Sequence, residues 1–109
     1  MAKTILQINY KFNSSRAEHT AWVGADADYI ARVPGLAWKV WLMNEAEHEA
    51  GGIYLFESRE AALEFVSSPA ITSFAAHPSL SAFSAKMFEA VESLSKITRG
   101  PLTVAEAVK

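Results

Sequence analysis

Residues 34–57 have the sequence PGLAWKVWLMNEAEHEAGGIYLFE, and this stretch decides the fold. Two apolar runs flank a short acidic stretch, which predicts a β-hairpin. Both alternating faces of the first run are apolar: Trp38, Val40 and Leu42 alternate with Ala37, Trp41 and Met43. A small antiparallel sheet normally leaves one face polar for water. We therefore expect helices on one face of the hairpin and a second copy of the chain on the other.

Composition limits the classes of protein that the chain can be. Its 109 residues, 50% hydrophobic and 20% charged, are typical of one folded domain over residues 1–109. The net charge of −2 gives no electrostatic reason to expect nucleic acid or a membrane surface as a partner. Without Cys there is no disulfide, thiolate nucleophile or Cys-ligated metal. No apolar run reaches transmembrane length and the first residues lack a signal-peptide pattern, so a cytoplasmic protein is expected.

The first third of the chain carries a strand pattern and then a helix pattern. Residues 4–12 predict a strand with Leu6, Ile8, Tyr10 and Phe12 on one face and Ile5, Gln7, Asn9 and Lys11 on the other. Ser15 and Glu18 have the spacing of a capping box, so we expect a helix from there to about Val33. Pro34-Gly35 ends this helix. Its expected inner face carries Trp22, Ala25, Tyr29 and Val33.

After the hairpin the chain repeats the helix and strand patterns. Ser58 predicts the start of a helix that carries Ala62, Leu63, Phe65 and Val66. Ser68-Pro69 predicts a fresh helix start, and this helix should extend to about His77. Residues 82–91 predict a last strand, with Phe83, Ala85, Met87 and Val91 opposite Lys86 and Phe88. Residues 98–109 are expected to form a mobile tail that frays or docks on a partner.

The order of these elements is strand, helix, strand, strand, helix, strand. This βαββαβ order is the ferredoxin-like arrangement of the α+β class, with an antiparallel sheet and helices on one face. The other face stays bare, and here it is apolar, which favours a homodimer.

The hairpin resembles the YdhR-type monooxygenases, a branch of the dimeric α/β-barrel superfamily. The resemblance rests on Pro34-Gly35, on residues 38–41 (WKVW) and above all on residues 48–56 (HEAGGIYLF). It extends more weakly to Leu6-Gln7 and to residues 86–88. It implies a dimeric α/β barrel that oxidises an aromatic or phenolic small molecule without a cofactor. Related enzymes that oxidise polycyclic phenols to quinones place Asn and Trp on the third strand, where this chain has Gly52 and Phe56.

Residues 68–77 (SPAITSFAAH) also resemble the haem-ligating helix of haem-degrading monooxygenases in the same superfamily. This second resemblance implies His77 as a haem ligand, with Asn9 nearby on the first strand. The Trp that those enzymes carry on this helix is absent, and Phe65 is the nearest aromatic residue. Haem binding therefore stands as an alternative to cofactor-free chemistry.

A cofactor-free oxygenase needs few groups: a base or cation for the phenolate, an amide to orient it, and an aromatic wall that excludes water. The catalytic candidates are His77, Lys86 and Asn9, and the substrate-binding candidates are Gln7, Trp38, Tyr54 and His48. Lys39 is a second strand lysine that could hold a phenolate if it is partly buried. We expect an apolar cavity between sheet and helices, lined by some of Asn9, Trp38, Tyr54, His77 and Lys86.

Ordinary structural explanations stay open for each candidate: core packing for the aromatic residues, solvent-facing ends for the lysines, and helix capping for His77. The three histidines are far apart in sequence, and we expect no metal site. Gly51-Gly52 lies within a strand, which predicts a β-bulge or a close backbone approach. A third function, a non-catalytic dimeric module that binds a small hydrophobic ligand, is separated from the oxygenase by oxygen uptake and from a haem protein by haem titration.

Overall fold

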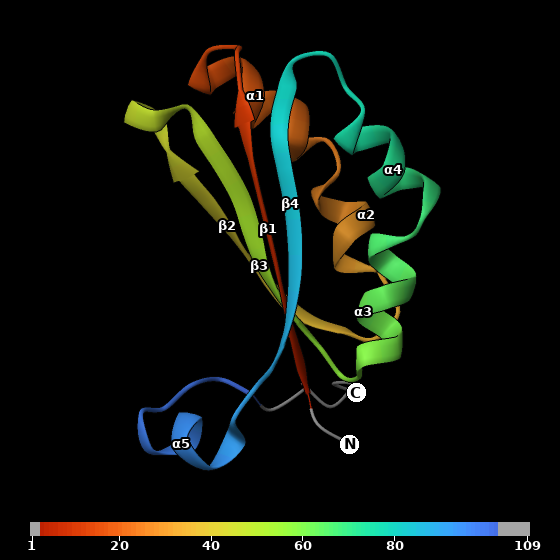
Figure 1. Cartoon of the computed structure of the whole chain (residues 1–109), viewed down its shortest axis with the longest axis vertical. Coiled ribbons are helices and arrows are strands. Elements are labelled where there is room, and N and C mark those ends of the chain that lie inside the picture. Colours follow the sequence, from red (N-terminus) through yellow and green to blue (C-terminus); the bar gives the residue numbers. More distant parts are fainter. Residues whose placement is uncertain (1–2, 103–109) are drawn as a thin grey trace.

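A computed structural model describes residues 3–102 and has one four-stranded antiparallel sheet in the order β2-β3-β1-β4. The strands are β1 (Thr4–Phe12), β2 (Leu36–Asn44), β3 (Glu49–Phe56) and β4 (Leu80–Glu89). Helices α1 (Arg16–Gly24), α2 (Ala27–Ala31), α3 (Arg59–Val66) and α4 (Pro69–Ala75) cover one face of the sheet (Figure 1). The predicted α+β, ferredoxin-like fold is confirmed.

The core lies between the sheet and this helix layer. Alternate residues of β1 are buried toward the helices: Leu6, Ile8, Tyr10 and Phe12. Tyr54 and Phe56 of β3 lie beside them, and Ala62 and Phe65 of α3 pack from above. The alternation predicted for the first strand is therefore correct, and it places Gln7 and Asn9 on the face opposite this helix layer.

The predicted helix starts are confirmed by their caps. Ser15 and Glu18 form the complete capping box of α1. The Ser58 hydroxyl accepts from the Ala61 backbone N–H at 3.1 Å, and Ser68 caps α4, which has Pro at its first position. Each cap satisfies backbone donors that a helix start leaves unpaired.

The single helix expected to extend to Val33 is two helices instead. The break falls after Gly24, a poor helix former, and the Asp26 N–H bonds back to the Val23 carbonyl at 2.9 Å. The change of direction alters the inner face. Ile30 is buried, whereas Tyr29, expected inside, is 51% exposed.

The hairpin is confirmed, and its irregularity lies at an unexpected place. The tip is a 3₁₀ turn over Glu45–Glu47 followed by His48 in a left-handed conformation, φ 52°. Gly51-Gly52 is not a bulge, because its pairing with β1 and β2 is continuous. Gly51 is a close backbone approach, since a Cβ there would collide with the Ile8 carbonyl. The bulge lies in β2, where the register shifts between Leu36 and Trp38.

The end of the chain differs from the sequence prediction. The last strand ends at Glu89, two residues early, and a short helix α5 (Glu92–Ile97) follows, which the serine-rich sequence did not indicate. Val91, expected in the strand, is 53% exposed. The chain then returns to the sheet, where the Trp38 indole N–H donates to the Pro101 carbonyl at 2.8 Å. Residues 103–109 of the predicted tail lie outside the described residues.

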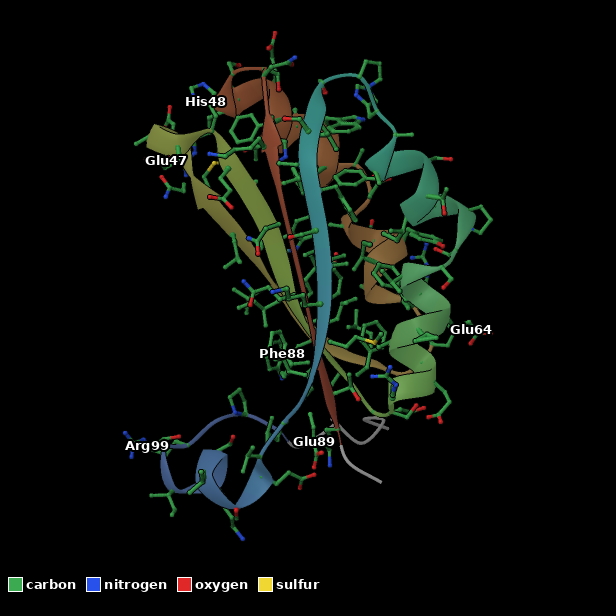
Figure 2. The ribbon with its side chains drawn as sticks, viewed as in Figure 1. Glu47, His48, Glu64, Phe88, Glu89 and Arg99 are labelled. Carbon is green, nitrogen blue, oxygen red and sulfur yellow. The ribbon has the colours of Figure 1, made fainter. Side chains whose placement is uncertain are left out.

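The face of the sheet opposite the helices, here called the open face, carries apolar side chains on all four strands. Val40 is 51% exposed and Phe88 is 50% exposed, and Figure 2 shows Phe88 pointing away from the helix layer. In the described residues no helix is long and apolar enough to cross a membrane.

Candidate active site

A cavity of about 260 Å³ lies between the sheet and the helices. Its lining is mostly apolar and comes from β1, β2, β3, α2, α4 and the end of α1: Ile8, Tyr10, Val23, Asp26, Tyr29, Ile30, Lys39, Trp41, Gly51, Tyr54, Ala70, Ile71 and Phe74. Three charged or large lining residues, Asp26, Tyr29 and Trp41, are exposed to solvent, so they mark the mouth of the cavity. Asp26 stands in the break between α1 and α2, so this irregularity helps to open the cavity.

Lys39 is the cation of this cavity. The bulge in β2 pairs Lys39 with Tyr54, on the helix side of the sheet. Its Nζ lies 3.3 Å from the ring centroid of Trp41 and 4.6 Å from that of Tyr54. Among the described residues no carboxylate lies within 4 Å of this amine. The two aromatic faces are thus its close electrostatic partners.

Gly52 provides the room that Lys39 occupies. It pairs with Trp41 in the sheet, on the helix side of β3, and a Cβ there would lie 2.5 Å from Lys39 Cε. Real Cβ atoms do not approach another carbon so closely, so any larger residue would displace the lysine chain. The Lys39 side chain therefore passes over Gly52 to reach the cavity.

Burial changes the proton affinity of this amine. Loss of hydration lowers the pKa of Lys39 from its ordinary 10.5 to about 7, and the negative charge of Asp26 offsets part of the effect. Desolvation disfavours the ammonium form, whereas the ring faces and Asp26 favour it. Lys39 therefore changes charge near neutral pH.

Tyr10 and His19 form a buried hydrogen-bonded pair behind the cavity. The Tyr10 hydroxyl and His19 Nε2 are 2.8 Å apart, and His19 is only 3% exposed. Burial raises the pKa of Tyr10 to about 12 and lowers that of His19, so both groups stay neutral at pH 7. The Nδ1 atom of His19 is buried with no partner among the described residues. Tyr10 thus lines the cavity as a neutral residue whose hydroxyl is held by a neutral imidazole.

Tyr54 is the sequence-predicted site residue that lines the cavity. Burial, and after it the neighbouring Tyr10, raises the pKa of Tyr54 above its ordinary value. Its ring packs against Phe65 at 5.2 Å between centroids and faces Lys39 on the other side. It is a neutral aromatic wall.

Four other candidates lie on the open face. Gln7 and Asn9 are joined there by a 2.9 Å hydrogen bond from Gln7 Nε2 to Asn9 Oδ1. Lys86 pairs with Gln7 across β1 and β4 and is exposed. Trp38, expected in the cavity, is turned to the open face by the bulge in β2. Of the residues expected to line the cavity in part, Tyr54 does so, whereas Asn9, Trp38 and Lys86 lie on the opposite face of the sheet.

The two histidine candidates lie at other places. His48 is exposed at the tip of the hairpin (Figure 2), with its ring 5.4 Å from Phe12. The His77 ring packs against Trp22 at 4.4 Å between centroids, and its Nδ1 accepts from the Ser79 N–H at 3.1 Å. Neither lines the cavity.

The residues do not fit haem as the second resemblance implied. His77 follows α4 and packs on Trp22 without lining the cavity, and Asn9 lies on the opposite face of the sheet. The cavity of about 260 Å³ is also smaller than the ~300–1,000 Å³ usual for drug-sized ligands. Within residues 3–102 no group of three or more His, Asp or Glu side chains could hold a metal ion.

The fold and its cavity define a class: a ferredoxin-like domain with a mostly apolar space between sheet and helices. A sequence model of the family described as "Putative mono-oxygenase ydhR" matches residues 5–101. The chain therefore belongs to the ydhR family.

Solved structures share the fold at low sequence identity. SnoaB from Streptomyces nogalater, a cofactor-independent oxygenase, is 18% identical, with a TM-score of 0.66 over 83% of this chain and 94% of that chain. The heme-degrader MhuD from Mycobacterium tuberculosis is 24% identical, with a TM-score of 0.61 over 80% and 95%. NE2512 from Nitrosomonas europaea, of unknown function, is 13% identical, with a TM-score of 0.68 over 84% and 91%. No curated protein matches the chain significantly.

Proposed function

We propose that this protein is a cofactor-independent monooxygenase that oxidises a small phenolic substrate in the helix-side cavity. The observation that carries the proposal is the position of Lys39, whose Nζ lies between Trp41 and Tyr54 in the wall of an apolar cavity. Membership of a mono-oxygenase family and the fold shared with SnoaB, a cofactor-independent oxygenase, support it.

The size of the cavity bears on the substrate. A volume of about 260 Å³ lies just below the range for drug-sized ligands. One or two fused aromatic rings match this space better than a four-ring polyketide. Such rings would lie against Trp41 and Phe74, which line the cavity.

The first step is removal of the phenol proton. An unperturbed phenol has a pKa of about 10, and a neutral lysine amine beside it can accept the proton. Because the pKa of Lys39 is lowered to about 7, a large share of the amine is neutral at physiological pH. The resulting ammonium then pairs with the phenolate in a site with little water, where this attraction is strong. Lys39 thus serves as base and then as counter-ion.

The second step transfers electrons to oxygen. The phenolate gives one electron to O₂, the two radicals combine as a ring peroxide anion, and the Lys39 ammonium returns its proton to give a ring hydroperoxide. Loss of water from this hydroperoxide leaves a quinone, so one phenol and one O₂ give one quinone and one H₂O. The substrate supplies all the electrons, and the protein supplies the base, the counter-ion and a shielded space.

Lys39 also explains the departure from the quinone-forming relatives. By the sequence resemblance, Gly52 stands where those enzymes carry Asn. In this chain the space above Gly52 is filled by the Lys39 side chain. We infer that a lysine from β2 replaces the polar side chain of β3 as the group that meets the substrate.

Oxygen consumption with a panel of naphthols and other hydroxylated bicyclic compounds tests the proposal. Lys39→Met should slow turnover about 10²–10⁴-fold, the usual worth of a positioned base. Lys86→Met and His77→Ala test the candidates taken from sequence, and Lys96→Met, on the exposed helix α5, is the matched control.

The pattern of losses decides between the residues. A loss in Lys39→Met alone supports the cavity site. A loss in Lys86→Met or His77→Ala, with Lys39→Met unaffected, would place the chemistry elsewhere. No oxygen uptake with any member of the panel would favour a non-catalytic module that binds a small aromatic ligand.

We also propose a homodimer in which two open faces meet. Val40 and Phe88 leave about half of their surface in water, and Ile5 and Ile53 lie between them in the sheet. Covering such a face gains about 25 cal/mol for each Å² of apolar area. A single species of monomer mass in sedimentation at micromolar concentration would refute it.

A further inference from the structure

The Lys39 amine has features of a nucleophile as well as those of a base. Its Nζ stands in the wall of a cavity whose lining is mostly aromatic and aliphatic. Among the described residues no carboxylate lies within ion-pair distance of this amine. A desolvated lysine in an apolar pocket is the usual setting for attack on a carbonyl carbon.

The neighbouring groups suit such a reaction. Flat rings on both sides of the amine, Trp41 and Tyr54, would stack on an aromatic aldehyde and hold its carbonyl near Nζ. The Asp26 carboxylate at the mouth and the neutral Tyr10 hydroxyl are polar groups of the same lining. They can exchange the protons that loss of water requires.

We propose that Lys39 is a covalent capture site for flat aromatic aldehydes, which it binds as an imine. The amine nitrogen attacks the carbonyl carbon, and a proton moves from nitrogen to oxygen to give a carbinolamine. The C–O bond then breaks, the oxygen leaves as water, and a C=N bond remains. No oxidant is needed, so this reactivity does not rest on the oxygenase function.

Selectivity follows from the charge state of the amine. At pH 7 about half of Lys39 is neutral, whereas an ordinary lysine with a pKa of 10.5 is neutral in about one molecule in 3,000. A less basic amine is also a weaker nucleophile, which reduces the advantage. We expect at least about tenfold more modification at Lys39 than at any of the other five lysines.

The experiment uses hydroxynaphthaldehyde and cyanoborohydride with the full chain under nitrogen. Reduction of the imine fixes the adduct as a secondary amine, and the protein gains the mass of the aldehyde less one oxygen atom. Chymotryptic peptide mapping then locates the adduct and separates it from any at the chain's α-amine. Lys39→Arg should remove the main adduct, and Lys96→Arg should leave it unchanged.

A competition with wild-type protein covers the case in which Lys39→Arg fails to fold. Naphthol has the same flat shape but no carbonyl, so it should lower modification of Lys39 and leave the exposed lysines unaffected. Equal modification of all lysines, or modification of Lys39 that naphthol does not reduce, would overturn the proposal. Capture without oxygen uptake would refute the proposed oxygenase alone, and oxygen uptake without capture would refute this inference alone.

Discussion

Replacing Lys39 with Met should stabilise the protein at pH 6–7, and the gain should disappear as the pH rises toward 10. The folded state lowers the pKa of this amine from 10.5 to about 7. Between these two values the unfolded chain holds a proton that the folded chain has lost, so wild-type stability should rise with pH across this window. Below about pH 7 both states are protonated, and the folded state carries the full cost of burying an ammonium.

The size of the effect follows from the same two pKa values. The difference between 10.5 and about 7, at ~1.4 kcal/mol per pH unit, sets an upper limit of about 5 kcal/mol. Lys39 keeps partial contact with water, which reduces the cost. We therefore expect Lys39→Met to gain about 2–3 kcal/mol near pH 6. Methionine is of similar length and should keep the packing on Trp41 and Tyr54.

Urea unfolding at fixed protein concentration, from about pH 6 to pH 10, measures this gain. Groups other than Lys39 titrate alike in both proteins, so the difference between wild type and Lys39→Met isolates the amine. Lys96→Met, at an exposed site on α5, should differ from wild type by a small amount that does not change with pH. Parallel pH profiles for wild type and Lys39→Met would mean an ordinary lysine pKa, and the proposed base would lose its physical basis.

Four further perturbations test other features of the structure. Gly52→Ala should push the Lys39 chain out toward water, lower aldehyde capture and reduce the rise of stability between about pH 7 and pH 10; unchanged capture would show that the glycine is not needed. Tyr10→Phe leaves His19 with no partner at either nitrogen and should cost about 1–3 kcal/mol, whereas a cost near zero would show that the pair is unimportant. Burial lowers the pKa of His19, so wild-type stability should also fall as the pH drops below 6.5, and His19→Gln should flatten that part of the profile. Val40→Asp puts a charge on the open face and should dissociate the proposed dimer in sedimentation, and a variant that stays dimeric would place the interface elsewhere.

Regular periodicity was sufficient to predict the fold. The alternation of Leu6, Ile8 and Tyr10 identified the buried face of β1, and the serine caps identified the starts of α1, α3 and α4. These signals depend on neighbours within a few residues, so one sequence contains them in full. The resemblance of the hairpin to YdhR-type proteins was likewise local, and the family match extends it over residues 5–101.

The site was harder to predict because one inserted residue in β2 changed the face of the sheet to which the following side chains point. Continuous alternation from Leu36 would have turned Trp38 to the helices and Lys39 to the open face. The bulge at Ala37 reverses this parity, so Lys39 enters the cavity and Trp38 leaves it. Both lysines considered as site candidates, Lys39 and Lys86, were visible in the sequence, and the parity of β2 decided which of them lies in the cavity.

Three local irregularities together create the candidate site. The bulge in β2 brings Lys39 to the helix side, Gly52 leaves room for its chain, and the break after Gly24 puts Asp26 at the mouth. Without the bulge the amine would lie in water on the open face with an ordinary charge. With an alanine at position 52 it would collide with β3, and with one continuous helix the mouth would lose Asp26. Each irregularity weakens regular secondary structure, and each helps to place the Lys39 amine, with its pKa lowered to about 7, beside an apolar cavity. Their coincidence at one residue is the strongest structural reason to place the chemistry at Lys39.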